Sequence, residues 1–414
     1  MSAPAPELVT ATAAGGLTVT ATALSTVPLL QARLAIRLRL DTPADLAVSD
    51  VLAACLSLHP ATARLEQVGG IASVSRRRDW LMLGLHAATE HQPLIAGTLA
   101  ALVGAALSDG LVSRAVTLVT QQASLTASQP AVHATRRMWS QYFGHLPPAL
   151  DPCPDPALTA RITRQEVTAA LHRFVTPRHA HLALVGDTRP HEAAARFSAA
   201  LAHWKPAARH DDGPDPLRAP VPAPGITSSH RPGQDQTQIR LIAPGPPRTS
   251  VADFAAHQAA ATVLGGSFSS RINTVLREQH GLAYRCRAGT DYAGRDFTVI
   301  EADVHTRHAG QAVRLLMDLT GKFAATGPTE EELRAARGFL TGAYTINTGS
   351  QSGRASLLTA ALTQDLPPSA LTDVPRALAA LTAADVRAAA GRYRPALLSG
   401  VVCGDATDHP GQWR

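Results

Sequence analysis

An arginine and a tyrosine at a fixed separation are the most distinctive chemical feature of this sequence. Arg277 lies in the last turn of a helix expected over residues 271–280, which Gly281 ends. Tyr284 follows on the next expected strand. A guanidinium fork and a phenol both donate hydrogen bonds, so together they can stabilise a peptide carbonyl as it becomes an oxyanion. Each also has a structural alternative, because a cation suits a helix C-terminus and an aromatic side chain suits a half-buried strand.

The stretch that contains this pair, LGGSFSSRINTVLREQHGLAY over residues 264–284, resembles the substrate-binding segment of pitrilysin/insulinase-type zinc metallopeptidases. It is most similar to that of the short bacterial members, which are related to the mitochondrial processing peptidases. In that family an arginine and a tyrosine at this separation point into a closed chamber and hydrogen-bond the substrate backbone near the scissile bond. The resemblance therefore implies that Arg277 and Tyr284 bind substrate and assist catalysis.

The zinc motif of this family has no counterpart in the first half of the chain. Active members carry His-x-x-Glu-His on their first long helix, with two histidine ligands and a glutamate base, and a glutamate ligand further on. Alignment from the RLEQVGG stretch at residues 64–70 puts Asp50, Ala53 and Ala54 at the motif positions. Residues 91–165, where the third ligand would fall, contain no glutamate. The sequence thus predicts a degenerate zinc motif, with no metal or other cofactor in this chain.

Two other places contain metal-ligating residue types. A histidine-containing segment at residues 86–91 has two histidines five positions apart, which do not share a helical face, and we interpret it as a turn. Glu301, Asp303 and His305 alternate along an expected strand, so they share one face that a metal could use. A polar face toward solvent or a chamber is the alternative that we favour.

An internal repeat indicates two homologous halves. Residues 163–187 are echoed by residues 382–405, and each copy consists of a helix that leads into an apolar strand. In each copy a threonine and an acidic residue three positions later have capping-box spacing, and a proline ends the helix. The pairs are Thr163 with Glu166 and Thr382 with Asp385.

Helices grouped around an antiparallel sheet, present twice, predict an α+β fold of two homologous domains. We expect a first domain over residues 1–204, a proline-rich linker over 205–225 and a second domain over 226–414. The expected strands cover residues 17–22, 34–40, 71–75, 80–86, 182–187, 238–242, 282–288, 297–305 and 401–405, and the expected helices cover 45–68, 163–177, 252–280, 329–346 and 382–395.

Composition narrows the class of protein. The chain has 414 residues, 45% of them hydrophobic, a net charge of +6 and a pI near 9.5. Its arginines are spread along expected helices without interleaved aromatic residues, which does not favour nucleic-acid binding. The one tight basic run, residues 76–78, is interpreted as a solvated strand end or turn. Four scattered cysteines predict buried free thiols.

The same composition predicts a cytoplasmic protein without a membrane segment. No apolar run approaches the ~18 residues that a membrane-spanning helix needs. The N-terminus lacks the basic and apolar regions of a signal peptide.

These observations favour a non-catalytic, substrate-binding subunit of a heterodimeric zinc metallopeptidase. In heterodimeric relatives one chain brings zinc and the other brings the arginine–tyrosine pair, so the resemblance implies a homologous catalytic partner with an intact His-x-x-Glu-His motif. The chain would be inactive alone, with Arg277 and Tyr284 acting in trans and Ser73 also contacting the peptide. The possible peptides include leader peptides of ribosomal peptide natural products, on the resemblance alone.

Two other hypotheses stay open. The first is a stand-alone peptide-binding or scaffold protein without peptidase activity. The second, which the sequence favours least, is an assembly subunit like the core proteins of respiratory complexes.

Overall fold

The computed structural model describes residues 7–205, 224–246 and 250–405. It divides into two compact units that are not contiguous in sequence. Most of the predicted linker, residues 206–223, lies outside the described residues. The first unit comprises Met1–Ala127, Pro148–Gly213 and Thr345–Thr372, and the second comprises Ser128–Pro147, Pro214–Tyr344 and Asp373–Arg414.

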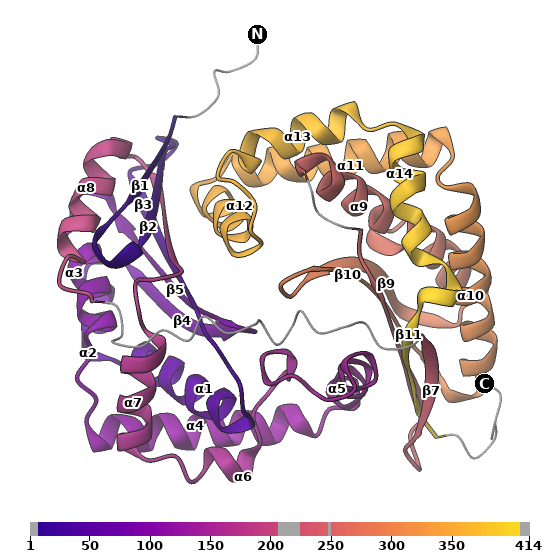
Figure 1. Ribbon diagram of the computed structural model, residues 1–414, viewed down its shortest axis with the longest axis horizontal. Helices are drawn as coiled ribbons and strands as arrows, with labels where there is room; N and C mark the ends of the chain where they lie inside the picture. Colours follow the sequence, from indigo (N-terminus) through magenta and orange to yellow (C-terminus); the bar gives the residue numbers. More distant parts are fainter. Residues whose placement is uncertain (1–6, 206–223, 247–249, 406–414) are drawn as a thin grey trace. The chain divides into compact units, whose positions relative to one another are not determined.

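The first unit contains a mixed sheet with the strand order β1-β2-β6-β3-β5-β4 (Figure 1). β2 and β6 are parallel, and the other neighbouring strands are antiparallel. β6 is internal to the sheet, and its nearly continuous apolar sequence suits a strand buried on both faces. The strands are Leu8–Thr12 (β1), Thr18–Ala23 (β2), Leu29–Arg37 (β3), Ile71–Arg77 (β4), Trp80–Ala88 (β5) and Ala180–Gly186 (β6).

The second sheet, with the order β7-β11-β8-β10-β9, repeats the topology of five of these six strands. It corresponds to β2-β6-β3-β5-β4, and β7 and β11 form the matching parallel pair. The duplicated topology agrees with the predicted repeat, and the predicted α+β class is confirmed. The strands are Gly225–His230 (β7), Gln236–Pro244 (β8), Ala283–Tyr292 (β9), Asp296–His305 (β10) and Ser399–Gly404 (β11).

Helices cover these sheets within each unit (Figure 1). In the first unit they are Pro43–Ser57 (α1), Pro60–Glu66 (α2), Gln92–Val103 (α3), Asp109–Ala127 (α4), Pro156–Thr159 (α6), Arg164–Phe174 (α7), Pro190–Ala200 (α8) and Gln351–Thr363 (α12). The second unit holds Pro130–Phe143 (α5), Val251–Ala261 (α9), Ala309–Thr326 (α10) and Ala383–Ala390 (α14), while Glu330–Thr348 (α11) and Ala370–Ala380 (α13) cross the boundaries between the units.

Each half of the sequence gives one helix to the sheet of the other half. α5 packs on β8 and β11, and its Trp139 and Tyr142 rings lie 5.5 and 5.4 Å from the ring of Phe297. α12 packs on β3 and β6, where Leu358 joins a buried cluster with Val185. The repeat in the sequence does not reveal this exchange, because it depends on packing between segments that are distant along the chain.

Several predicted boundaries differ from those observed. β3 begins at Leu29 and ends at Arg37, so residues 38–40 of the predicted strand leave the sheet. β1 and β7 were not predicted, because their small and hydroxyl-bearing residues lack a clear apolar alternation. The four cysteines are all buried and free, as predicted. No single helix among the described residues is long and apolar enough to cross a membrane, although α1 and α2, bent by 43°, meet that criterion as a pair.

Both capping boxes form, and they provide a matched test of the repeat. We expect Thr163→Ala and Thr382→Ala each to lower the free energy of unfolding by ~1 kcal/mol, because each removes the acceptor of one helix N-terminal amide. Chemical denaturation measures the change. Thr117→Ala, on an exposed turn of α4, is the control and should have little effect. Unchanged stability in both cap variants would contradict the assignment.

Candidate functional site

Asp50, Ala53 and Ala54 lie on α1, at spacings that place them on one face of the helix. Ala53 is buried, and Asp50 and Ala54 are half-buried. Alanine has no group that can bind a metal or accept a proton. The structure therefore brings the three predicted motif positions together without a ligand set.

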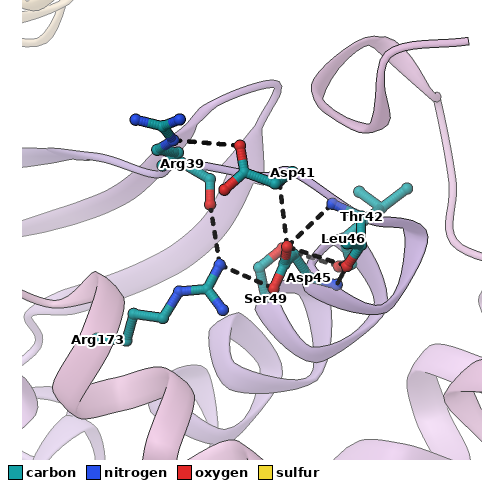
Figure 2. A network of polar contacts seen from close by, with 7 residues as sticks. All are labelled: Arg39, Asp41, Thr42, Asp45, Leu46, Ser49 and Arg173. Atoms are coloured by element: carbon teal, nitrogen blue, oxygen red, sulfur yellow. Dashed lines mark hydrogen bonds and ion pairs between the residues drawn. The ribbon is translucent and has the colours of Figure 1, made fainter. Parts of the chain in front are cut away.

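A polar network fixes the first turn of α1, just before these positions (Figure 2). Asp45 accepts hydrogen bonds from the backbone amides of Asp41 and Thr42, and Thr42 caps the Asp45 amide in return. Arg173 of α7 pairs with Asp45 at 2.9 Å and also donates to the backbone oxygen of Arg39. The start of α1 is thus held to α7, and the position of Asp50 is set by both helices.

Asp50 is paired with an arginine from the edge strand of the sheet. Nε of Arg76 lies 2.5 Å from Oδ1 of Asp50, and Nη2 lies 3.2 Å from Oδ2, so the contact is bidentate. Nη1 of Arg76 donates to the backbone oxygen of Arg78 at 3.0 Å. The side chain of Arg76 is only 6% exposed, against 18% for Asp50. Both oxygens of the carboxylate at the first motif position therefore accept hydrogen bonds from the Arg76 guanidinium.

This pairing corrects one sequence prediction. We expected residues 76–78 to be a solvated strand end or turn. Arg78 does form the turn, with φ of +56°, and Arg77 is exposed. Arg76 instead points toward α1, because side chains alternate between the two faces of β4.

Zinc, which the resemblance implies for the family, does not fit these residues. A zinc site needs three protein ligands or more, and the three motif positions supply one carboxylate. Both oxygens of that carboxylate already accept hydrogen bonds from Arg76. Binding a metal there would require breaking a largely buried ion pair and leaving the Arg76 guanidinium without its carboxylate.

The other places that contain metal-ligating residue types are also engaged with neighbouring side chains. Glu301 accepts a hydrogen bond from Arg287 at 2.7 Å, and Asp303 pairs with Arg240 at 2.7 Å. Burial alone would raise the pKa of Glu301, but the hydrogen bond and charge of Arg287, with the other arginines, hold it below its ordinary value. Within the described residues, no cluster of three metal-ligating side chains is found.

Ser73 lies on β4, which forms the edge of the first sheet in the described part of the chain. Its side chain is exposed, and its hydroxyl donates to the backbone oxygen of Gly84 at 3.3 Å. The outer backbone groups of an edge strand can pair with an added peptide strand. Ser73 and Arg76 therefore occupy the same candidate peptide-binding strand, on opposite faces.

Arg277 and Tyr284 lie close together in the second unit. The Arg277 guanidinium carbon lies 5.7 Å from the Tyr284 ring centroid and 5.4 Å from that of Phe268. Tyr284 is 90% exposed and Phe268 is 77% exposed. We call these three residues the Arg277 cluster. Among the described residues, no side-chain hydrogen bond or ion pair involves Arg277 or Tyr284, so their donors are available to a ligand.

Two glycines shape the backbone around this cluster. Gly281 follows the helical segment Asn273–Gln279 with φ of +61°, a conformation that favours glycine and ends the helix. Gly265 lies against the backbone of Ala288 on β9, where a Cβ atom would collide with the amide nitrogen. The helical segment is a π-helix, a form that the sequence did not predict.

A buried asparagine connects the three segments that carry the cluster. Nδ2 of Asn273 donates to the backbone oxygen of Ser267 and to the Ser270 hydroxyl, each at 3.0 Å. Its Oδ1 accepts from the Cys286 thiol at 3.3 Å. Burial raises the pKa of Cys286 to about 11, partly opposed by the charge of Arg277, so the thiol remains a donor at neutral pH. Asn273 thus fixes the turn of Phe268 and the strand of Tyr284 to the helical segment of Arg277.

Arg271 anchors the same segment to α11. Its Nε and Nη2 lie 2.6 and 2.7 Å from the two carboxylate oxygens of Glu332. Glu332 also accepts from the amide of Thr329, whose hydroxyl accepts from the Glu332 amide, so the two residues form a capping box. Burial alone would raise the pKa of Glu332, but the hydrogen bonds from Arg271 and Thr329 hold it below its ordinary value of 4.5.

Sequence reasoning missed Phe268 and Asn273. The signal for Phe268 was a single aromatic residue among serines, which no periodic pattern explains. Asn273 gave no signal, because an asparagine within a helix has no distinctive spacing.

Comparison with known proteins identifies the architecture. Residues 161–340 match the family model described as the peptidase M16 inactive domain. Over these residues the chain is similar to the M16 peptidase family. The predicted resemblance is confirmed, and the matched segment, an inactive M16 peptidase-like domain, contains the whole Arg277 cluster. A search among curated proteins found no match.

Solved structures of low sequence identity share the fold over nearly the whole chain. The peptidase M16 inactive domain from Pseudomonas fluorescens is 21% identical, with a TM-score of 0.84, covering 96% of this chain and 98% of its own. A protease from Helicobacter pylori is 16% identical, with a TM-score of 0.83 and coverage of 96% and 100%. A chain of Complex III2 from Candida albicans is 12% identical, with a TM-score of 0.76 and coverage of 97% of both chains.

The Asp50–Arg76 pair can be tested by stability. Arg76→Met should lower the free energy of unfolding by about 2–3 kcal/mol, because it leaves Asp50 unpaired in a largely buried position. The double variant Asp50→Leu with Arg76→Met should lose less than the single variant, because no charge is then left unpaired. Arg189→Met, in the exposed pair with Glu192, is the control and should leave the free energy of unfolding nearly unchanged. Equal losses in Arg76→Met and Arg189→Met would contradict the account.

Glu332 should make stability depend on acid pH. Its pKa is lowered in the folded state, so its contribution is present above about 4.5 and is lost as the pH falls through the folded value. Glu332→Gln should cost about 1–2 kcal/mol at pH 7, and its difference from the wild type should shrink below about pH 4.5. Denaturation across pH measures this. The exposed Glu331→Gln should show neither effect, and a pH-independent loss in Glu332→Gln would contradict the charge-based explanation.

Proposed function

We propose that this chain is a non-catalytic, peptide-binding subunit that acts in the cytoplasm with a homologous zinc-bearing peptidase chain. The observation that carries the proposal is the Asp50–Arg76 pair, together with Ala53 and Ala54 at the other motif positions. This face of α1 offers neither a metal-ligand set nor a general base. Hydrolysis of a peptide by the family's chemistry would need zinc and base from another chain.

The Arg277 cluster supports the binding part of the proposal. Arg277 and Tyr284 keep their donors free on a surface that Asn273 and Arg271 fix in place. Donors held in position before the ligand arrives stabilise developing charge at little cost in reorganisation. In the proposed complex they would donate to the peptide carbonyl as it becomes an oxyanion, and zinc held by the partner would supply the activated water.

Peptide binding by strand addition also fits the topology. β4 and β9 are the corresponding edge strands of the two sheets in the described part of the chain, and β9 begins at the cluster. An extended peptide would gain main-chain hydrogen bonds along such an edge, and nearby side chains would give selectivity. Leader peptides of ribosomal peptide natural products are one candidate class, on family resemblance alone.

The experiment is reconstitution with the zinc-bearing partner. Arg277→Ala and Tyr284→Phe should leave the complex intact but lower turnover by ~10²–10³, the effect of one lost oxyanion donor. Arg277→Lys should also be impaired, because it keeps the charge but loses the planar fork. Measurement of kcat, with size-exclusion chromatography of each complex, separates chemistry from assembly.

The matched control is Arg334→Ala, an exposed arginine on α11, which should keep full turnover. Full turnover in both Arg277→Ala and Tyr284→Phe would exclude the catalytic contribution. A stand-alone peptide-binding or scaffold role would then be the better explanation.

A further inference from the structure

We propose that Phe268 is a positioning residue of the peptide-binding cluster. It covers one face of the Arg277 guanidinium and so directs the in-plane N–H donors of Arg277 toward a peptide oxygen. This inference rests on the proposed function, and it adds a residue that neither the sequence pattern nor the family match assigns.

The first support is the distance between the guanidinium and the two aromatic rings. The guanidinium carbon of Arg277 lies within 6 Å of both ring centroids, 5.4 Å for Phe268 and 5.7 Å for Tyr284, so both contacts are in cation–π range. All five guanidinium donors lie in the plane of the group. Contacts with aromatic rings leave these donors unused, and an oxygen acceptor such as a peptide carbonyl or carboxylate can take them.

The second support is the exposure of Phe268. With 77% of its surface accessible, the ring gains little from core packing, and its position is not explained by burial. It lies in a turn that leaves the helix at Gly266. Its aromatic contact in the described structure is with Arg277.

The third support is the rigidity of the turn that carries Phe268. The amide of Ser270 donates to the backbone oxygen of Ser267, and Asn273 donates to that same oxygen. Ser270 and Asn273 are themselves buried. The backbone on both sides of Phe268 is therefore fixed to the helical segment that carries Arg277, as a positioning role requires.

The test uses substitutions that separate the aromatic face from side-chain volume. Phe268→Leu keeps much of the volume but loses the π face, whereas Phe268→Tyr keeps the π face. In the reconstituted complex, Phe268→Leu should lower kcat/KM by about 2–5-fold, the effect of one exposed cation–π contact, and Phe268→Tyr should match the wild type. Phe339→Leu, at an aromatic residue on α11 that is 52% exposed, is the control and should have no effect.

A double-mutant cycle then tests whether Phe268 acts through Arg277. In an Arg277→Ala background, Phe268→Leu should cause no further loss, because the group that it positions is gone. A full additional loss would mean that Phe268 contacts the peptide directly, which overturns the proposal. Equal activity of Phe268→Leu and Phe268→Tyr would overturn it as well.

A structural readout on the free chain makes failure of this inference distinguishable from failure of the proposed function. The NMR signal of the Arg277 Nε–H should be shifted by the ring, should move in Phe268→Leu and should be kept in Phe268→Tyr. Full turnover of Arg277→Ala would overturn the proposed function, and with it the role of Phe268 in peptide binding. If Arg277→Ala instead loses turnover while the Nε–H signal stays unchanged in Phe268→Leu, that pair of results would overturn only the role of Phe268.

Discussion

The ion pair between Asp50 and Arg76 is the contact on which this account depends. It joins the middle of α1 to the edge strand β4 through two hydrogen bonds, and a third bond holds Arg76 to the following turn. Charge pairs in largely buried positions are costly to break from one side, because the remaining charge loses both its partner and its water. The helix face that carries the degenerate motif positions is therefore stabilised by a side-chain cation. That arrangement suits a wall of a binding site better than a reaction centre.

The Arg277 cluster in the second unit differs from the Asp50–Arg76 pair, because among the described residues its side-chain hydrogen-bond donors are not paired. Its structural contacts are made by the buried Asn273 and the half-buried pair Arg271 and Glu332, while the donors of Arg277 and Tyr284 are left free. Rigid support beneath free donors is what a binding site requires, since the donors need not reorganise when the ligand arrives. The described part of the chain thus combines a pair of free donors with a helix face that offers no metal-ligand set.

Local features of the fold could be predicted from the sequence, and long-range pairings could not. The capping boxes at Thr163 and Thr382 and the helix stop at Gly281 depend on residues within one turn, so spacing alone reveals them. The exchange of α5 and α12 between the sheets depends on contacts between distant segments. The β1 and β7 strands were not predicted, because they lack large apolar residues in alternation.

In the candidate site, too, local features could be predicted from the sequence and long-range contacts could not. The placement of Asp50, Ala53 and Ala54 on the first helix followed from the alignment with the family's zinc motif, and residues at this spacing share one helical face. The ion-pair partner of Asp50 could not be predicted in this way. A run of three arginines does not indicate which side chain points toward α1 until the register of β4 is known. Phe268 was missed because its contact with Arg277 depends on a turn that Asn273 fixes from the next segment.

Metal analysis of the purified chain tests the central claim most directly. We predict far less than one zinc per chain after exposure to zinc and removal of the excess, with no change in Asp50→Ala, because Asp50 is held by Arg76 and has no neighbouring ligands. About one tightly held zinc per chain that Asp50→Ala abolishes would contradict the account, since α1 would then be a metal site.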